Sequence, residues 1–465
     1  MIKGLFFLGA FALCVPVQIL AAGQSVDMVE PDLRARIDRI AVGVMEQRGV
    51  PSASVAVVKN GKVVYTHAYG KAHVNPDKPA TPEMRYSIGS ISKQFASAAI
   101  LMLQEQGKLS VDDAVGKYVP GLTSGDEVTI RQILSHTAGY EDYWPEDYLI
   151  SPMMKPITPQ QILEKWAKKP LDFEPGTQWQ YSNTGYVIAG LIVEKVSGEK
   201  LMDFLQEHIF RPLGMKAVWD CDEAELPAAD AMRYMRAALG PLRPAPKEGR
   251  GWIFAGGELA MTAYDLALWD ESLIARSLLK PESYKEMFTE VKLTNGKGTG
   301  YGLGVEASTQ DGHLELFHDG EVMGFFAFND VLVDDGAAVA VLTNYMGLGA
   351  DEIAQLTLST VTKKPLKPSE EQALALYRGL QLGHLDRTLL APNLNDYFDE
   401  KTVADFRGSL GPLGEPLKFR EVAESLRGGM TFRVFQIDYP TLRLDLTTYT
   451  YPDGKLEQYL VERKD

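Results

Sequence analysis

The sequence has 465 residues, of which 45% are hydrophobic, enough material to bury a large core. Its 62 acidic and 47 basic residues give a formal net charge of -15, which argues against nucleic acids and anionic lipids as partners. Only two cysteines are present, Cys14 and Cys221, so a fold stapled by several disulfides is excluded.

The first 23 residues have the pattern of a secretory signal. A single charge, Lys3, is followed by an apolar run from Leu5 to Val17 and then by three small residues. The run is shorter than a membrane span and contains Pro16. We therefore expect a signal peptide over 1–23, export to the periplasm or the medium, and no membrane attachment after cleavage. Cys221 would then be the sole cysteine.

Two regular elements are predicted next. Apolar residues at helical spacing predict a helix over 32–47. Residues 54–65 carry two apolar runs on either side of Asn60-Gly61, which indicates a β-hairpin because this dipeptide suits the tight turn that matches strand twist.

A serine and a lysine three residues apart, Ser90 and Lys93, begin the following amphipathic segment. At this spacing on a helix both side chains share one face, and an amine that can lose its proton turns a neighbouring hydroxyl into a nucleophile. The same spacing recurs at 197–200 and 277–280, but only Ser90 has a glycine before it and a long apolar run after it. An ordinary N-cap serine beside a solvated lysine is the alternative interpretation.

Residues 109–277 are predicted to form helices and loops, and they contain the only Tyr-x-Asn triplet, Tyr181 and Asn183. In an extended segment these two side chains point the same way. Period-2 patterns return over 300–342, where His318 and Gly320 end a strand, and a helix is predicted over 350–361. The order of these elements predicts an α/β (α+β) fold, an antiparallel sheet flanked by helices with an inserted helical domain.

The end of the chain is predicted to be a separate unit. Residues 363–369 are basic and proline-rich, as in a linker, after a domain over 24–362. Residues 370–465 carry helical patterns over 370–382 and 394–406 and strand patterns over 430–437, 442–449 and 455–461. These patterns indicate a small α+β domain, which resembles the cystatin-like or nuclear-transport-factor-2-like folds. It shows no catalytic constellation, so we expect a packing or lid role, with binding of a cell-wall fragment as the alternative.

Several other chemistries lack their motifs. No G-x-S-x-G is present, so an α/β-hydrolase nucleophile elbow is excluded. The seven histidines form no H-E-x-x-H, and there is no G-x-x-x-x-G-K-[ST]. The sequence therefore predicts neither a metal nor a cofactor.

The Ser90, Tyr181 and His318 motifs, in this order, resemble the serine β-lactamase-like superfamily, in particular the branch of class C β-lactamases, D-alanyl-D-alanine carboxypeptidases, D-aminopeptidases and β-lactamase-fold esterases. The resemblance covers roughly 37–362 and extends to the segments 134–140, 255–259 and 301–304. It implies the transpeptidase-like version of the fold predicted above and a small-molecule or peptide substrate.

The third motif departs from the best-known members. Class A β-lactamases and many penicillin-binding proteins carry S-D-N and K-T-G where this chain has Tyr181-Ser182-Asn183 and His318-Asp319-Gly320. A lysine there is a permanent cation for a carboxylate, whereas a histidine is largely neutral near pH 7. The departure favours ester or peptide hydrolysis over β-lactam hydrolysis, although some D,D-peptidases of this branch also have His-x-Gly.

The resemblance implies a two-step acyl transfer. Ser90 attacks the carbonyl, while Lys93, its pKa lowered by burial, and Tyr181, favoured as a phenolate beside the ammonium, manage the proton. Asn183 would orient Lys93 and hold the substrate amide, and His318 and Gly320 would also bind and orient the substrate. The backbone N–H groups of Ser90 and Glu321 would form the oxyanion hole.

Two alternatives stay open: a class C-type β-lactamase, and a silent sensor that binds penicillins or peptidoglycan peptides. Because Ser90, Lys93, Tyr181 and Asn183 are all present, the sequence favours the enzyme. Residues 140–148 combine aromatic and acidic side chains; they are either a solvated loop anchored by its aromatics or a rim of the cleft that favours neutral or amine-bearing acyl groups. The natural substrate and the oligomeric state do not follow from the sequence.

Overall fold

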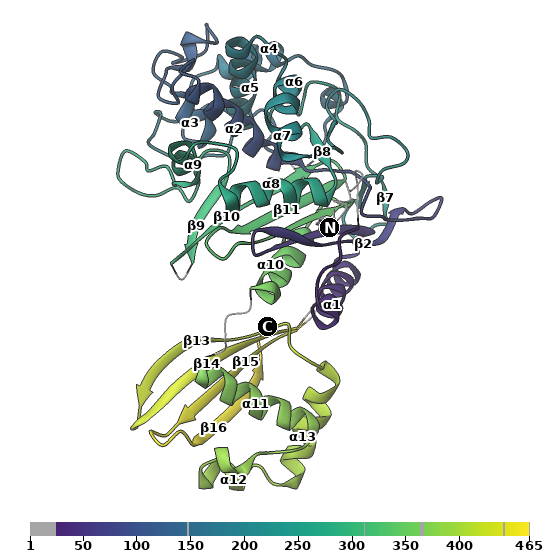
Figure 1. Cartoon of the computed structure of the whole chain (residues 1–465), viewed down its shortest axis with the longest axis vertical. Helices are drawn as coiled ribbons and strands as arrows, with labels where there is room; N and C mark the ends of the chain where they lie inside the picture. Colours follow the sequence, from purple (N-terminus) through teal and green to yellow (C-terminus); the bar gives the residue numbers. More distant parts are fainter. Residues whose placement is uncertain (1–24, 147, 311, 363–366, 440–441, 465) are drawn as a thin grey trace, which may run out of the picture.

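The computed structural model describes residues 25–146, 148–310, 312–362, 367–439 and 442–464, so the predicted signal over 1–23 lies outside the described residues. Along the long axis of the molecule lie a helical layer, a central sheet, two helices beneath that sheet and a C-terminal unit (Figure 1). The predicted antiparallel sheet with an inserted helical domain is confirmed.

The central sheet has seven antiparallel strands in the order β3-β2-β1-β12-β11-β10-β9. Its middle joins the beginning and end of the domain, since Ala53 pairs with Thr343 and Val58 with Ala338. The strands are β1 (Ser52–Lys59), β2 (Lys62–His73), β3 (Lys78–Pro79), β9 (Glu306–Gln310), β10 (His313–Val322), β11 (Phe325–Leu332) and β12 (Ala337–Thr343).

The predicted hairpin is confirmed, with its turn at Asn60 and Gly61. Both residues have positive φ, 53° and 69°, as a two-residue turn between twisted strands requires. Glycine adopts this conformation without strain and asparagine with little.

Helices cover both faces of the sheet (Figure 1). On one face, Val55 and Val57 of β1 pack in a common core with Ile37 and Ile353, which belong to α1 (Pro31–Arg48) and α10 (Ala350–Val361). The predicted bounds of α1 differ by one residue at each end, and those of α10 are reproduced. On the other face lies α8 (Ala263–Ala275), in the core that also contains Ala56. Strand β1 therefore presents apolar side chains to both faces of the sheet.

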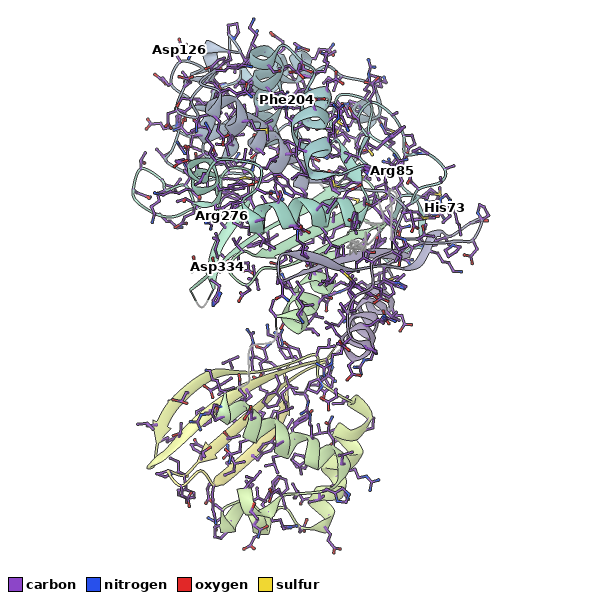
Figure 2. All side chains as sticks on the ribbon, in the orientation of Figure 1. His73, Arg85, Asp126, Phe204, Arg276 and Asp334 are labelled. Atoms are coloured by element: carbon purple, nitrogen blue, oxygen red, sulfur yellow. The ribbon has the colours of Figure 1, made fainter. Side chains whose placement is uncertain are left out.

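The helical layer is formed by the chain between β3 and β9. Its core includes an edge-to-face pair between Phe95 and Phe210, with ring centroids 5.6 Å apart. Figure 2 labels Phe204, a buried residue of this layer, and also Asp334, in the turn between β11 and β12, where it accepts the Leu314 amide. The helices are α2 (Ser92–Glu105), α3 (Ile130–Leu134), α4 (Pro159–Ile162), α5 (Asn183–Ser197), α6 (Leu201–Leu205), α7 (Arg211–Leu213) and α9 (Pro281–Phe288).

Shorter elements complete this part of the chain. Five short strands are β4 (Tyr86–Ser87), β5 (Trp219–Asp220), β6 (Tyr234–Met235), β7 (Arg243–Pro244) and β8 (Leu259–Met261). Single helical turns are η1 (Gly89–Ile91), η2 (Val115–Lys117), η3 (Ser151–Met154), η4 (Leu163–Ala167) and η5 (Gln206–Phe210).

The C-terminal residues pack around a core of their own, in which Tyr377, Phe398 and Leu446 are buried. A four-stranded antiparallel meander runs β13 (Lys418–Arg427), β14 (Met430–Tyr439), β15 (Leu442–Thr450) and β16 (Leu456–Arg463), and the helical elements are α11 (Pro368–Leu382), η6 (Arg387–Leu389), α12 (Pro392–Tyr397), α13 (Glu400–Leu410) and η7 (Gly411–Leu413). The suggested likeness to cystatin-like or nuclear-transport-factor-2-like folds stays a prediction, as do the exact domain boundaries.

Three details of this unit differ from the sequence-based expectation. The helix predicted over 394–406 is wrong as a single element, because Asp399 accepts the Thr402 amide (2.7 Å) and starts a new helix there. Strand β13 was not predicted, since most of its side chains are exposed and show no apolar alternation. Of the predicted linker over 363–369, residues 363–366 lie outside the described residues, and Pro368 already begins α11.

None of the helices in the described part of the chain combines the length and the apolar character that crossing a bilayer demands.

Candidate active site

Ser90 lies in the helical turn η1, which leads into α2 and rests directly on strand β10. The contact leaves no space for side chains: a Cβ on Gly89 would lie 2.6 Å from the Glu321 nitrogen, and one on Gly320 would lie 1.9 Å from the Ile88 oxygen. Gly89 also has a φ of 49°, which glycine adopts readily. The two glycines therefore allow the serine turn to meet the backbone of the sheet.

Lys93 lies one turn further along, fully buried beneath Ser90. Its Nζ donates to Ser90 Oγ (2.9 Å), Asn183 Oδ1 (2.8 Å) and the Gly256 carbonyl (2.9 Å). Burial lowers the pKa of Lys93 to about 7, against the opposing charges of Asp142 and Asp319. Near neutral pH a large fraction of this amine is unprotonated and can accept the serine proton.

Tyr181 approaches Ser90 from the segment before α5. Its hydroxyl donates to Ser90 Oγ (2.8 Å), and Lys93 Nζ lies 4.9 Å from its ring centroid. Burial raises the pKa of Tyr181 well above its ordinary value. Loss of hydration therefore favours the protonated phenol in this resting site, the reverse of the phenolate that was expected.

Asn183 is the first residue of α5, and Ser182 before it has an extended backbone, φ -149° and ψ 117°. This geometry directs the phenol of Tyr181 and the amide of Asn183 into the same site, as the triplet predicted. The amide is held from behind by Asp142, whose Oδ1 accepts both the Asn183 backbone N–H (3.0 Å) and Nδ2–H (3.2 Å). The sequence placed Asp142 only within the 140–148 segment and did not predict this contact with Asn183.

His318 is brought close to the other motifs but lies below the surface of the cleft. Its ring is buried, with Nε2 2.7 Å from the Tyr301 hydroxyl and Nδ1 against the Asp319 carbonyl. Burial lowers its pKa, so the ring is neutral near pH 7. Among the described residues, Asp319 and Glu321 line the cleft but His318 and Gly320 do not. His318 and Gly320 therefore have no direct contact with the cleft through which they could orient a substrate, as was predicted for them.

His136 is a second residue that the sequence left without a role. Its Nδ1 accepts the Ser182 amide (3.1 Å), and its ring stacks on Tyr181 with centroids 4.2 Å apart. The backbone of His136 has a φ of 60°, uncommon for a residue with a side chain. The segment 134–140 was recognised as a family motif, but only the fold places its histidine under the tyrosine.

The cleft above Ser90 has a volume of about 690 Å³. Apolar and aromatic residues, including Trp144, Trp179 and Met346, form much of its surface. Its charged lining is acidic, and among the described residues that line it none is lysine or arginine. The acidic residues are Asp142, Glu146, Glu306, Asp319 and Glu321.

The rim of the cleft includes the aromatic and acidic segment after Gly139. Residues 142–146 line the cavity, and Tyr140 and Tyr143 are buried beneath it. This position agrees with the second of the two interpretations, a rim rather than a distant surface loop. Asp147, in the same segment, lies outside the described residues.

In the described part of the chain no group of three or more histidine, cysteine or acidic side chains is arranged to hold a metal ion. Cys221 is buried, and burial raises the pKa of its thiol to about 12, so the thiol is unreactive.

Comparison with known proteins gives the following matches. The sequence model of the Beta-lactamase family matches residues 37–361. Penicillin-binding protein 4* of Bacillus subtilis is 27% identical over 308 residues, 63% of this chain and 68% of that protein. The D-aminopeptidase of Brucella anthropi is 28% identical over 315 residues, 65% of this chain and 58% of that protein.

Solved structures are similar as well. The octameric penicillin-binding protein homologue from Pyrococcus abyssi has a TM-score of 0.63 and 25% identity, covering 93% of this chain and 96% of that chain. A D-stereospecific amidohydrolase from Streptomyces sp. has a TM-score of 0.60 and 26% identity, covering 70% of this chain and 97% of that chain.

Proposed function

The chain belongs to the Beta-lactamase family, and on that premise we propose that it is an exported serine hydrolase that cleaves esters or amides through an acyl-enzyme on Ser90. One observation carries the proposal: Lys93 Nζ and Tyr181 Oη lie 2.9 and 2.8 Å from Ser90 Oγ. A nucleophile flanked by a buried amine and a buried phenol has both a base and an acid within reach. The signal pattern over 1–23 supports export.

The contacts suggest one role for each group. Neutral Lys93 accepts the proton as Ser90 attacks the carbonyl, and Tyr181, still protonated, donates to the leaving group. The resulting lysine ammonium then restores the tyrosine proton. The oxyanion would be held by the N–H groups of Ser90 and Glu321, which the contact between Gly89 and β10 brings together. Water finally hydrolyses the acyl-serine.

The first prediction concerns the acyl-enzyme itself. A fluorophosphonate probe should label the full chain on the peptide that contains Ser90, and p-nitrophenyl acetate should be hydrolysed with acetyl-Ser90 as the intermediate. Mass spectrometry of the digested protein checks both. A folded protein that is neither labelled nor active on any short ester would exclude the enzyme and favour the silent sensor.

The second prediction concerns the charge of the substrate. Because the cleft presents acidic groups and no lysine or arginine among its described lining residues, it should attract a substrate ammonium and repel a carboxylate. We expect kcat/KM for a D-amino-acid amide with a free amine to exceed that for its N-acetyl derivative by about tenfold or more. The names of the D-aminopeptidase and D-stereospecific amidohydrolase relatives support D-configured substrates.

The panel should also contain a carboxylate-ended D-alanyl-D-alanine peptide and a chromogenic cephalosporin. Both should be poor substrates, since a carboxylate would enter a cleft whose third motif offers a neutral, buried His318 instead of a lysine. Clear preference for either compound over the free-amine amide would reverse the proposed specificity while leaving the acyl-enzyme intact.

A further inference from the structure

Asp142 lies in the cleft rim. Asn183 separates the Asp142 carboxylate from Lys93, one of the groups proposed to react. This carboxylate is contacted only through donors: its Oδ1 accepts the backbone N–H of Asn183 (3.0 Å), the Asn183 Nδ2–H (3.2 Å) and the Trp144 N–H (3.2 Å), and its Oδ2 accepts the same Nδ2 (3.3 Å). Burial raises the pKa of the Asp142 carboxyl, while these N–H donors and the nearby Lys93 oppose the shift by favouring the ionised form. The negative charge of Asp142 is therefore stabilised by the N–H groups of Trp144 and Asn183 that surround it.

These contacts decide which way the Asn183 amide faces. An asparagine amide has one accepting and one donating end, and the two ends are nearly equal in size. With Nδ2 held by Asp142, Oδ1 is turned toward Lys93, from whose Nζ it accepts (2.8 Å). In the reverse orientation an NH2 group would face the lysine, and the amine would lose one of its three acceptors.

The negative charge of Asp142 also favours the ammonium form of the buried Lys93. Of the charges that favour the ammonium form of Lys93, Asp142 contributes most, followed by Asp319 of β10 and Glu258 before β8. Burial raises the pKa of Glu258 well above its ordinary range, so that carboxyl is neutral, and the Asp319 side chain is 56% exposed and screened by solvent. The other titratable groups around this amine are His136, His318, Tyr181 and Tyr186, all neutral near pH 7.

We propose that Asp142 is a positioning residue of this enzyme: it fixes the Asn183 amide with its oxygen toward Lys93 and keeps a compensating negative charge behind that amine. The inference rests on the proposed acyl transfer, because Lys93 needs a defined position only if it moves the Ser90 proton. Asp142 itself touches neither Ser90 nor Tyr181.

The test is Asp142→Asn, which keeps the shape and removes the charge. An NH2 group in place of Oδ2, which lies 3.3 Å from Asn183 Nδ2, should disfavour the present orientation of the Asn183 amide. We expect kcat to fall about 10- to 100-fold. The acid limb of kcat/KM should move to lower pH, because losing the anion makes Lys93 easier to deprotonate. A side chain needed only for packing would not shift that limb.

The matched control is Glu141→Gln, which removes the neighbouring carboxylate; Glu141 pairs with Lys169 on the surface and should leave the pH profile unchanged. A double-mutant cycle with Asn183→Ala completes the test: Asp142→Asn should cost little more once the amide is gone. An unshifted limb together with additive losses would overturn the inference. Inactivity of the wild-type chain would instead overturn the proposed function.

If Asp142→Asn does not fold, Asp142→Glu gives a second test. The longer side chain keeps the charge but displaces the oxygen atoms, so the acid limb should stay in place while kcat falls. Wild-type kcat in Asp142→Glu would contradict the positioning role.

Discussion

Replacing Ser90 by alanine is expected to lower kcat about 10⁵- to 10⁶-fold and to abolish labelling by a fluorophosphonate. The Ser90 hydroxyl is hydrogen-bonded to both Lys93 and Tyr181. Its loss removes the nucleophile that forms the acyl-enzyme and the proton that Lys93 would accept. A millionfold loss corresponds to about 8 kcal/mol of transition-state stabilisation. Steady-state hydrolysis of p-nitrophenyl acetate measures it.

The chain supplies a control for this variant. Ser277 also stands three residues before a lysine, Lys280, but is exposed, and Ser277→Ala should keep full activity. If Ser90→Ala retained more than a few per cent of the activity and Ser277→Ala lost it, the nucleophile would have to be reassigned.

Replacing Lys93 by methionine is expected to lower kcat about 10³- to 10⁴-fold. In the wild type, only the neutral amine accepts the serine proton, so kcat/KM should rise with pH up to a midpoint near 7, where burial sets the pKa of Lys93. Below that midpoint the rate should fall tenfold per pH unit. In Lys93→Met, kcat/KM should no longer show this rise with pH, and kcat should be low at every pH.

Methionine fills much of the volume of the lysine, so the buried position stays packed. The control is Lys200→Met, in which an exposed lysine of another Ser-x-x-Lys sequence loses its ion pair with Glu194. A Lys93→Met variant with wild-type rate and pH profile would show that another group takes the serine proton.

Local patterns predicted the parts of this protein whose interactions are close in sequence. The Asn60-Gly61 turn, the helix over 350–361 and the pairing of Ser90 with Lys93 each depend on neighbours within a few residues. The order of three motifs then predicted that Tyr181 and Asn183 would meet Lys93, and the structure places them there.

What sequence reasoning missed depends on contacts between distant segments. Asp142 and Asn183 are 41 residues apart, and His136 reaches Ser182 across 46, so the sequence marked the segments 134–140 and 140–148 but not the partners of these two side chains. The phenolate expected at Tyr181 failed for a related reason, because the cost of burial depends on how completely the fold covers the side chain. Strand β13 was missed since its partner β14, not its own pattern, makes it a strand.

The contact between the Gly89 turn and β10 has a consequence for how such an enzyme diversifies. Added side chains at Gly89 or Gly320 would strike backbone atoms, which cannot rotate away. Trp144, Pro145 and Glu146 line the cleft in the rim segment, away from this contact. Substitutions that alter selectivity are therefore expected to be tolerated at the mouth of the cleft, whereas side chains at Gly89 and Gly320 in its floor are expected to disrupt the site.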